Sequence, residues 1–410
     1  MRFQTKLIHG NWKGDTKTGA TNVPIYYSNA YSHQTAEELE DIFIGKEAGY
    51  VYTRIANPTV EAFERRIATL ERGVAAIATS SGMAAIYLAF MNVLLPGDEV
   101  IASSGIFGGT YDLLKNLIEY NIHVKFVDDL DEDTLNREIT PKTKIVFSET
   151  IGNPKLDVLD IEKVGQICQE KNVLFIVDST VTSPYLIKPL EYGVDIVIHS
   201  TSKYINGTSN AIGGIIVDGG SKKFYSEKFP EFKEYTKRFK RFAFTAKLRN
   251  GIGKDLGAIM SPMNSFLNLT GIETLALRMK AHCENTLKVA EYLENHPKVA
   301  FVNYPNLKSS KYYNIAKKYY KKGTGSILTF RLGSKEKAFH FINNLKLIYN
   351  LPNIGDTKSV IIHPASTICA KNTKEEKEQM GVYEDLVRLS VGIEDVEDII
   401  EDIESSLVNI

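Results

Sequence analysis

Two neighbouring apolar runs, Val173-Leu-Phe-Ile-Val-Asp178 and Asp195-Ile-Val-Ile-His-Ser-Thr-Ser-Lys203, decide the fold class of this chain. Each run is short and nearly continuous in apolar residues, and charged or hydroxyl-bearing residues follow it. Strands of this kind belong to parallel or mixed sheets that helices cover on both faces. Ligands bind beyond the carboxyl ends of such strands. Chemistry is therefore expected at Asp178 and around Lys203.

The same alternation of helix and strand extends outward from these runs, from about residue 58 to residue 217. Helices are expected at 60–73, 82–95, 111–120 and 161–171, and further strands at 75–79, 99–102, 123–127 and 144–148. Beyond about residue 260 the pattern changes, with a long amphipathic helix at 271–295, strands at 299–304, 326–332, 360–363 and 386–391, and a last helix at 394–407. We predict an α/β fold with a mixed, mostly parallel sheet covered by helices, and a smaller C-terminal α+β domain.

Composition and charge exclude several classes of function. The chain has 410 residues, 43% of them hydrophobic and 24% charged, with 49 basic and 50 acidic residues and a net charge of −1. This balance of charges does not indicate binding to nucleic acid or to an anionic membrane. No apolar run approaches the roughly 18–20 residues of a membrane span, and the N-terminus lacks an apolar signal-peptide core. The three cysteines are far apart and have no metal-ligand spacing, so we expect no metal site and a cytoplasmic protein.

The candidate site residues are each ambiguous when taken alone. Asp178 could pair with a pyridinium nitrogen, or cap a helix or turn. Lys203 could form a Schiff base if its pKa is lowered, or be a solvated lysine, although Ser200 and Ser202 around it suit a phosphate ester. The start of a helix at Ser81-Gly82-Met83 could bind phosphate through free amides, or be a simple N-cap.

Three further stretches have the same ambiguity. Phe107 could stack on a flat ring or only pack a loop. Tyr52-Thr-Arg54 offers a phenol and a guanidinium for phosphate. Arg388 lies in the apolar strand Leu386-Val-Arg-Leu-Ser-Val391 and needs an anionic partner, either a substrate carboxylate or an internal acid. The order and joint presence of these residues carry more information than any one of them.

Together these residues resemble the Cys/Met-metabolism (trans-sulfuration) family of pyridoxal 5′-phosphate (PLP) enzymes, which have the aspartate-aminotransferase fold, fold type I. The resemblance covers nearly the whole chain. The matching stretches are Tyr52-Thr-Arg-Ile-Ala-Asn-Pro-Thr59, Ser80-Ser-Gly-Met-Ala84, Phe107-Gly-Gly-Thr110, Glu149-Thr-Ile-Gly-Asn-Pro154, Val177-Asp-Ser-Thr180, His199-Ser-Thr-Ser-Lys-Tyr204, Ile362-His-Pro-Ala-Ser-Thr367 and Val387-Arg-Leu-Ser-Val-Gly392. The stretches most similar to the O-acetylhomoserine sulfhydrylases within the family are Asp255-Leu-Gly-Ala-Ile-Met-Ser-Pro-Met-Asn264, Gly271-Ile-Glu-Thr-Leu275 and Asn353-Ile-Gly-Asp356.

The resemblance implies PLP as the cofactor and assigns roles to the candidate residues. Lys203 is implied as the Schiff-base lysine and proton carrier, Asp178 as the partner of the ring nitrogen, and Phe107 as the stacking residue. The other implied cofactor-binding residues of the same subunit are Ser81, Gly82, Met83, Thr180, Ser200 and Ser202. The implied substrate-binding residues are Arg388, Asn153, Asn353 and Thr367.

The resemblance also implies a homo-oligomer, usually a tetramer built as a dimer of dimers. Tyr52, as a catalytic group, and Arg54 would reach the phosphate of a neighbouring subunit. We therefore expect residues 1–53 to form an arm that contacts a neighbouring subunit, residues 54–260 to form the PLP-binding domain and residues 261–410 to form the C-terminal domain.

Three departures from the family pattern bear on the reaction. Phe107 stands where the family has tyrosine, Thr208-Ser209 where it has His-Gly, and Thr367-Ile368-Cys369 where it has Thr-Thr-His. Loss of the phenol disfavours the release of thiolates, which need a proton. It is tolerable for a carboxylate, because the pKa of a carboxylic acid is only about 4. The expected reaction is γ-replacement on an O-acyl-L-homoserine, with O-acetyl preferred, by sulfide or a small thiol, as in methionine biosynthesis.

Several alternatives stay open at this point. Cystathionine γ-synthase, methionine γ-lyase and a γ-replacement enzyme with another nucleophile would use the same cofactor residues. A nicotinamide dehydrogenase would suit the α/β pattern, but no Gly-x-Gly-x-x-Gly follows the first strand. A binding protein without catalysis would not need Lys203, Asp178 and Arg388. The basic run Ala316-Lys-Lys-Tyr-Tyr-Lys-Lys322 is read as a solvated helix face rather than a nucleic-acid contact.

Overall fold

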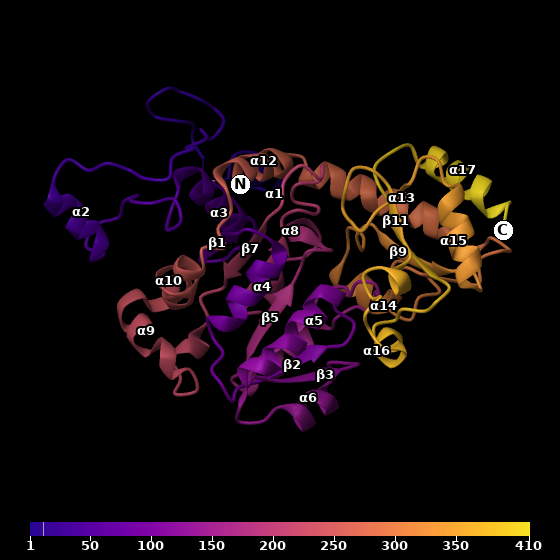
Figure 1. Cartoon of the computed structure of the whole chain (residues 1–410), viewed down its shortest axis with the longest axis horizontal. Helices are drawn as coiled ribbons and strands as arrows, with labels where there is room; N and C mark the ends of the chain where they lie inside the picture. Colours follow the sequence, from indigo (N-terminus) through magenta and orange to yellow (C-terminus); the bar gives the residue numbers. More distant parts are fainter. Residues whose placement is uncertain (11) are drawn as a thin grey trace.

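The computed structural model describes residues 1–10 and 12–410, and two sheets organise it (Figure 1). The larger sheet has seven strands in the order β1-β7-β6-β5-β4-β2-β3. These strands are β1 (Ala75–Thr79), β2 (Glu99–Ser103), β3 (His123–Val127), β4 (Thr143–Glu149), β5 (Leu174–Asp178), β6 (Ile196–Ser200) and β7 (Gly214–Asp218). Strands β2 to β6 pair in parallel, and β7 is antiparallel to β6 and β1. The prediction of a mixed, mostly parallel sheet is confirmed.

Helices cover both faces of the larger sheet because successive side chains of each strand point to opposite sides. Leu174 and Ile176 of β5 belong to one buried cluster, and Phe175 and Val177 to another. The helices that flank this sheet include α3 (Pro58–Glu71), α4 (Gly82–Met91), α5 (Gly108–Asn116), α6 (Glu132–Glu138), α7 (Ile161–Glu170), α8 (Ser183–Leu186), α9 (Lys233–Phe239), α10 (Ala243–Asn250) and α11 (Ile252–Leu256). Burial of each large aliphatic side chain stabilises the sheet by about 1.5–3 kcal/mol.

The smaller sheet is formed by the C-terminal part of the chain. Its five strands lie in the order β10-β11-β12-β9-β8. They are β8 (Phe301–Asn303), β9 (Ile327–Arg331), β10 (Tyr349–Asn350), β11 (Val360–Ile362) and β12 (Leu386–Ser390). The helices of this part are α12 (Pro262–Glu273), α13 (Leu275–Glu294), α14 (Tyr313–Tyr319), α15 (Lys335–Asn344), α16 (Lys374–Gln379) and α17 (Val396–Leu407). The predicted C-terminal strands and last helix are present, and β10, α15 and α16 were not anticipated.

The predicted long helix at 271–295 is wrong in its start. Two helices occupy the region, because α12 begins at Pro262 with the Ser261 side chain accepting from the Asn264 amide, and the chain breaks at Thr274. The Ser-Pro pair is a helix start signal that the periodicity obscured. Gly271 is needed in α12, since a Cβ there would lie 2.3 Å from the Asn206 carbonyl oxygen.

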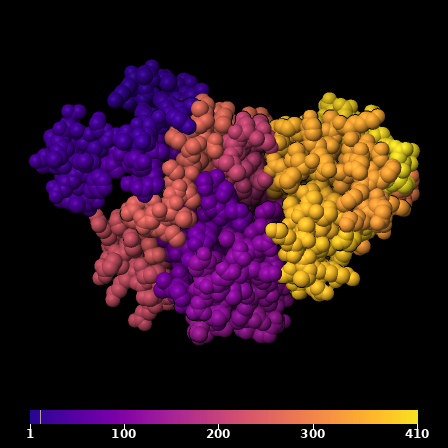
Figure 2. All heavy atoms as spheres, viewed as in Figure 1, coloured from indigo at the N-terminus to yellow at the C-terminus, as the bar shows by residue number. Residues whose placement is uncertain are grey.

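The N-terminal segment includes two helices that the sequence pattern did not indicate. Residues 3–8 form α1 (Phe3–Ile8), which packs on α3 of its own chain: Leu7 is 1% exposed, and Arg66 donates to its carbonyl oxygen. Part of the segment between α1 and α3, including α2 (Ala36–Phe43), stands away from the body, as Figures 1 and 2 show. Tyr27 and Phe43, at 76% and 68% exposure, present aromatic rings to solvent there.

No helix in residues 1–10 and 12–410 combines the length and hydropathy that a membrane crossing would need.

Candidate active site

A cavity of about 360 Å³ opens at the carboxyl ends of the parallel strands, with Lys203 in its wall. Most of the predicted site residues line this cavity. They are Ser81, Gly82, Met83, Phe107, Asn153, Asp178, Thr180, Ser200, Ser202, Lys203, Asn353 and Arg388. The sheet topology explains this convergence, since parallel strands deliver their following residues to one edge.

One wall of the cavity is formed by the start of α4 facing the end of β6. Ser81 caps the helix by accepting from the Ala84 amide at 3.1 Å. A Cβ on Gly82 would lie 2.7 Å from the Cβ of Ser200, so only glycine lets the helix start approach the strand end this closely. Ser200 and Ser202 add hydroxyls to the same cavity. Free amides at a helix start together with hydroxyls form a site suited to a phosphate group.

Lys203 has a free amine that donates to Asn353 Oδ1 at 2.5 Å. Burial, with a smaller contribution from the positive charge of Arg388, lowers the pKa of Lys203 to about 8. A lysine with this pKa has an appreciable neutral fraction near neutral pH, and the neutral amine is the form that attacks an aldehyde.

Two carboxyl groups lie side by side at the back of the cavity, because Glu149 of β4 is in register with Asp178 of β5. Burial raises the pKa of Asp178, while hydrogen bonds from Thr180 oppose the rise, its amide donating at 2.8 Å. Burial and the Asp178 charge raise the pKa of Glu149 well above its usual value. Glu149 Oε1 accepts from the Phe107 amide at 2.8 Å, and Oε2 has no hydrogen-bond partner among the described residues. The register therefore places two carboxyl groups with raised pKa values side by side, and the hydrogen bonds from Thr180 favour ionisation of Asp178 over Glu149.

Arg388 reaches the cavity from β12 of the smaller sheet. Its Nη1 donates to Asn153 Oδ1 at 3.0 Å and its Nη2 to the Asn353 carbonyl oxygen at 3.2 Å. Arg388 is 3% exposed, its guanidinium faces no acid in these contacts, and its Nε lacks a partner within the described residues. Burial lowers the pKa of Arg388 to about 10. A buried cation with neutral partners is suited to an anionic ligand such as a carboxylate.

The cavity fits PLP on the observations above. It combines a buried carboxylate, a lysine with a lowered pKa, a phenylalanine and a helix start beside two hydroxyls. These residues match the ring nitrogen, the aldehyde, the ring face and the phosphate of PLP. Glu149 was not among the predicted site residues, although it directly follows the strand expected at 144–148. Its strand-end position was the available signal, and only the register places it beside Asp178.

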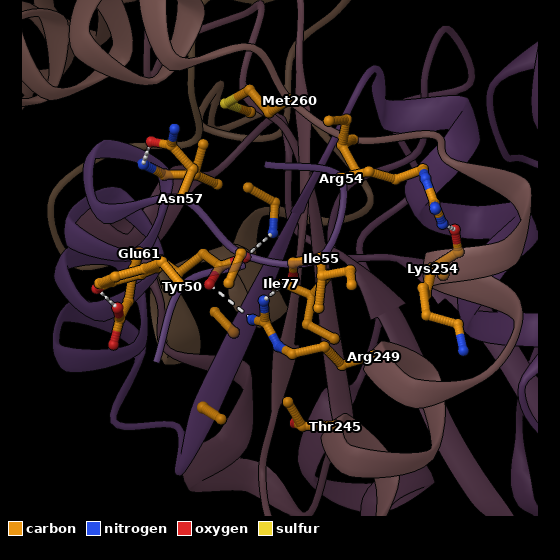
Figure 3. Close-up of a pocket in the computed structure, with 18 of the residues that line it drawn as sticks. Tyr50, Arg54, Ile55, Asn57, Glu61, Ile77, Thr245, Arg249, Lys254 and Met260 are labelled. Atoms are coloured by element: carbon orange, nitrogen blue, oxygen red, sulfur yellow. Dashed lines mark hydrogen bonds and ion pairs between the residues drawn. The ribbon is translucent and has the colours of Figure 1, made fainter. Parts of the chain in front are cut away.

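Three predicted site residues lie outside this cavity. Thr367 donates its hydroxyl to the His363 carbonyl oxygen at 2.7 Å. Tyr52 is 41% exposed. Arg54 lines a second cavity of about 830 Å³ between the N-terminal segment, α3, β1 and α10, where it donates to the Lys254 carbonyl oxygen at 2.6 Å (Figure 3). Tyr52 and Arg54 therefore do not reach the Lys203 cavity of their own chain.

The fold and the cavity define the class: a PLP-dependent enzyme of fold type I, with the lysine just beyond a sheet strand. The chain belongs to the Cys/Met metabolism PLP-dependent enzyme family, whose model matches residues 4–408.

Named relatives are similar over the full length of the chain. The O-acetyl-L-homoserine sulfhydrylase of Leptospira meyeri is 43% identical over 99% of this chain and 97% of that protein. The homocysteine synthase of Schizosaccharomyces pombe is 40% identical over 99% of this chain and 98% of that protein. A solved structure of a putative O-acetylhomoserine (thiol)-lyase from Campylobacter jejuni has a TM-score of 0.95, with 34% identity and complete coverage of both chains. That structure contains N′-pyridoxyl-lysine-5′-monophosphate.

Proposed function

We propose that this chain is an O-acetyl-L-homoserine sulfhydrylase, which replaces the γ-acetate of O-acetyl-L-homoserine with sulfide to give homocysteine and acetate. The observation that carries this proposal is the charge of the cavity wall. Besides Lys203, the only cationic side chain among the described residues that line it is Arg388. The names of the relatives, O-acetyl-L-homoserine sulfhydrylase and homocysteine synthase, support the same reaction.

One guanidinium can neutralise one carboxylate. In the proposed complex, Arg388 neutralises the α-carboxylate of the amino-acid substrate. An O-succinyl ester, or cysteine as nucleophile, would bring a second carboxylate into the same cavity. Much of the remaining lining is apolar and cannot hold that charge: Met83, Ile86, Phe107, Val181, Ile212, Pro352, Ile354 and Ile368. An unpaired buried carboxylate is costly, whereas an acetyl ester and sulfide add no second carboxylate. The charge balance thus favours sulfhydrylation over cystathionine synthesis.

Each residue of the cavity has a proposed task in this reaction. Bound PLP supplies an electron sink for negative charge that develops on the amino acid. Arg388, held by Asn153, binds the substrate carboxylate and fixes its orientation. Lys203 takes a proton from one carbon of the substrate and returns it to another. Asp178 stays ionised so that the ring nitrogen keeps its proton.

Phe107 supports acetate as the leaving group. It packs in the cavity wall without a phenol, so it donates no proton. Acetate needs none near neutral pH, because the pKa of its acid is about 4. A thiolate leaving group would need one, and release of methanethiol or cysteine is therefore disfavoured.

The phosphate cradle would be completed by a second copy of the chain. Tyr52 and Arg54 are proposed to reach the phosphate of that copy, with residues 1–53 as the contacting arm, residues 54–260 as the PLP-binding domain and residues 261–410 as the C-terminal domain. The exposed aromatic rings of Tyr27 and Phe43 support such a contact. The assembly would be a homotetramer formed as a dimer of dimers.

A cytoplasmic location is supported by the three cysteines, which are free and buried.

The test is an assay of the purified PLP-loaded protein with O-acetyl- or O-succinyl-L-homoserine, each offered sulfide, cysteine and methanethiol. We expect homocysteine and acetate from O-acetyl-L-homoserine and sulfide, at the highest kcat/KM of all the pairs. The Lys203→Ala variant should form neither product. Preference for the succinyl ester with cysteine would assign cystathionine γ-synthase instead, and 2-oxobutyrate from methionine would assign methionine γ-lyase.

A further inference from the structure

A line of hydrogen bonds leads away from Lys203 to a buried carboxylate outside the cavity. Lys203 Nζ donates to Asn353 Oδ1 at 2.5 Å, and Asn353 Nδ2 donates to Ser209 Oγ at 2.8 Å. Ser209 Oγ in turn donates to Asp356 Oδ2. Neither Ser209 nor Asp356 lines the cavity. Their connection to Lys203 therefore runs through the Asn353 side chain.

The order of donors along this line is fixed at both ends. An ammonium group only donates hydrogen bonds, and an ionised carboxylate only accepts them. A hydroxyl does both, and an amide has one accepting end and one donating end of almost the same shape. With Asp356 ionised, Ser209 must give its proton to Asp356 and accept from Asn353. The amide of Asn353 then presents its oxygen to Lys203.

Asp356 is held in the ionised state that this order requires. Its side chain is buried, at 3% exposure, and Oδ1 accepts from Lys358 Nζ at 2.8 Å and from the Lys358 amide at 3.1 Å. Burial raises the pKa of Asp356, but the hydrogen bonds from Lys358 and Ser209 outweigh burial and leave the pKa below its usual value.

Ser209 occupies a backbone conformation that favours glycine. Its φ is +58°, in the left-handed region where a Cβ costs conformational energy. Glycine would remove that cost but would also remove the hydroxyl that joins Asn353 to Asp356. The two loops are tied a second time, since the Thr357 amide donates to the Gly207 carbonyl oxygen at 2.9 Å. Serine at this strained position thus supplies a hydroxyl that glycine lacks.

We propose that Asp356 and Ser209 are positioning residues for Lys203, which keep the accepting end of the Asn353 amide turned toward the lysine amine. This inference rests on the proposed role of Lys203 and not on the identity of the substrate. Lys203 must carry a proton from one carbon of the substrate to another. The fixed oxygen of Asn353 stabilises the ammonium form, in which the lysine carries that proton. Without Ser209 or the Asp356 charge, the amide can rotate and direct its NH₂ at the ammonium, which lowers the basicity of Lys203.

The other charged groups around Lys203 are expected to stay in place when Ser209 is changed. Glu149, Asp178 and Arg388 face the same cavity, and none of them contacts Ser209 in the hydrogen bonds and ion pairs of the described residues. Arg388 holds the main-chain oxygen of Asn353 rather than its amide. A rotated amide should therefore affect proton transfer by Lys203 and leave carboxylate binding by Arg388 intact.

The experiment compares Ser209→Gly, Ser209→Ala and Asp356→Asn with the control Thr208→Ala. Thr208 is the neighbouring residue, and its hydroxyl contacts Asn206 rather than the line to Lys203. The first readout needs no substrate: the rate at which the cofactor-free protein takes up PLP is followed against pH. The midpoint of that profile reports the pKa of Lys203, and it should move down by about one pH unit in the three variants, the size of one charge-assisted hydrogen bond. The second readout is the steady-state rate, where kcat should fall about tenfold with little change in KM.

The two serine variants separate the hydroxyl from the backbone strain. Ser209→Gly relieves the strain and Ser209→Ala retains it, so equal shifts in both point to the hydroxyl. An unchanged uptake midpoint in Ser209→Gly, or an equal shift in Thr208→Ala, would overturn the proposal. If the midpoints shift as expected while the wild type forms no homocysteine, the positioning role stands and the proposed substrate is wrong.

Discussion

Replacement of Arg388 by lysine tests the assignment of the substrate carboxylate most directly. The guanidinium donates one hydrogen bond to the Asn153 side chain and one to the main-chain oxygen of Asn353. Its Nε has no partner within the described residues. Lysine keeps the charge but cannot hold both contacts and also present a planar pair of donors to a carboxylate. The expected loss is one charge-assisted hydrogen bond, about 1.5–3 kcal/mol. That energy corresponds to a fall of about 10- to 150-fold in kcat/KM.

The fall should appear mainly in KM, because the carboxylate is bound equally in the ground state and in the transition state. The assay measures kcat and KM for homocysteine formation from O-acetyl-L-homoserine and sulfide. A second arm measures inhibition by O-acetyl-3-aminopropanol, which lacks the carboxylate. The wild type and Arg388→Lys should bind that compound with about equal affinity.

Arg278→Lys is a matched control for this prediction. Arg278 is also a buried arginine whose pKa burial lowers to about 10, but it donates to the main-chain oxygens of Tyr204, Ile205 and Gly271. Its replacement should lower Tm without raising KM. An unchanged KM in Arg388→Lys, or an equal rise in Arg278→Lys, would refute the assignment.

Three more substitutions test other parts of the site. Lys203→Ala should abolish the absorbance band of lysine-bound PLP and all turnover, and retention of the band would remove Lys203 from its role. Phe107→Tyr should leave acetate release within about twofold but raise elimination from substrates with thiolate leaving groups, by up to the 10²-fold at the lower end of general acid catalysis. A variant with no gain on such substrates would show that the missing phenol does not set the leaving group. In the cofactor-free protein, the raised pKa of Glu149 means that the contribution of this residue to stability is fully present below the unfolded value of 4.5 and is lost as pH rises toward the folded pKa. Glu149→Gln should therefore raise Tm more at pH ~8 than at pH ~5, and scanning calorimetry that finds the same difference at both pH values would show that Glu149 is not protonated.

Much of the larger sheet could be predicted from the sequence, because its strands are buried on both faces. Val173 to Val177 is apolar at every position, and such a run has few alternatives to a covered strand. The prediction was weaker where burial is partial. The start of α12 was missed because its apolar periodicity is low, and α1 was not anticipated because its packing on α3 depends on one buried residue, Leu7.

The site was predictable in its residue types and not in its contacts. Asp178 and Lys203 follow adjacent strands, so their proximity follows from the order of the chain. Arg388 and Asn153 are 235 residues apart, and Lys203 and Asn353 are 150 apart. A local sequence pattern cannot predict contacts between residues so far apart in the chain. These contacts depend on how the smaller sheet packs against the larger one.

The sequence alone determined the covered parallel sheet, because its strands are short apolar runs, and it indicated the PLP cofactor through the family motifs around Lys203. Only the tertiary structure decided which neighbours tune that lysine. Strand register sets Glu149 beside Asp178, and the approach of two distant loops joins Lys203 through Asn353 and Ser209 to Asp356. Hydrogen bonds and charge interactions act over a few ångströms, so a sequence supplies the groups but only the fold brings them within reach.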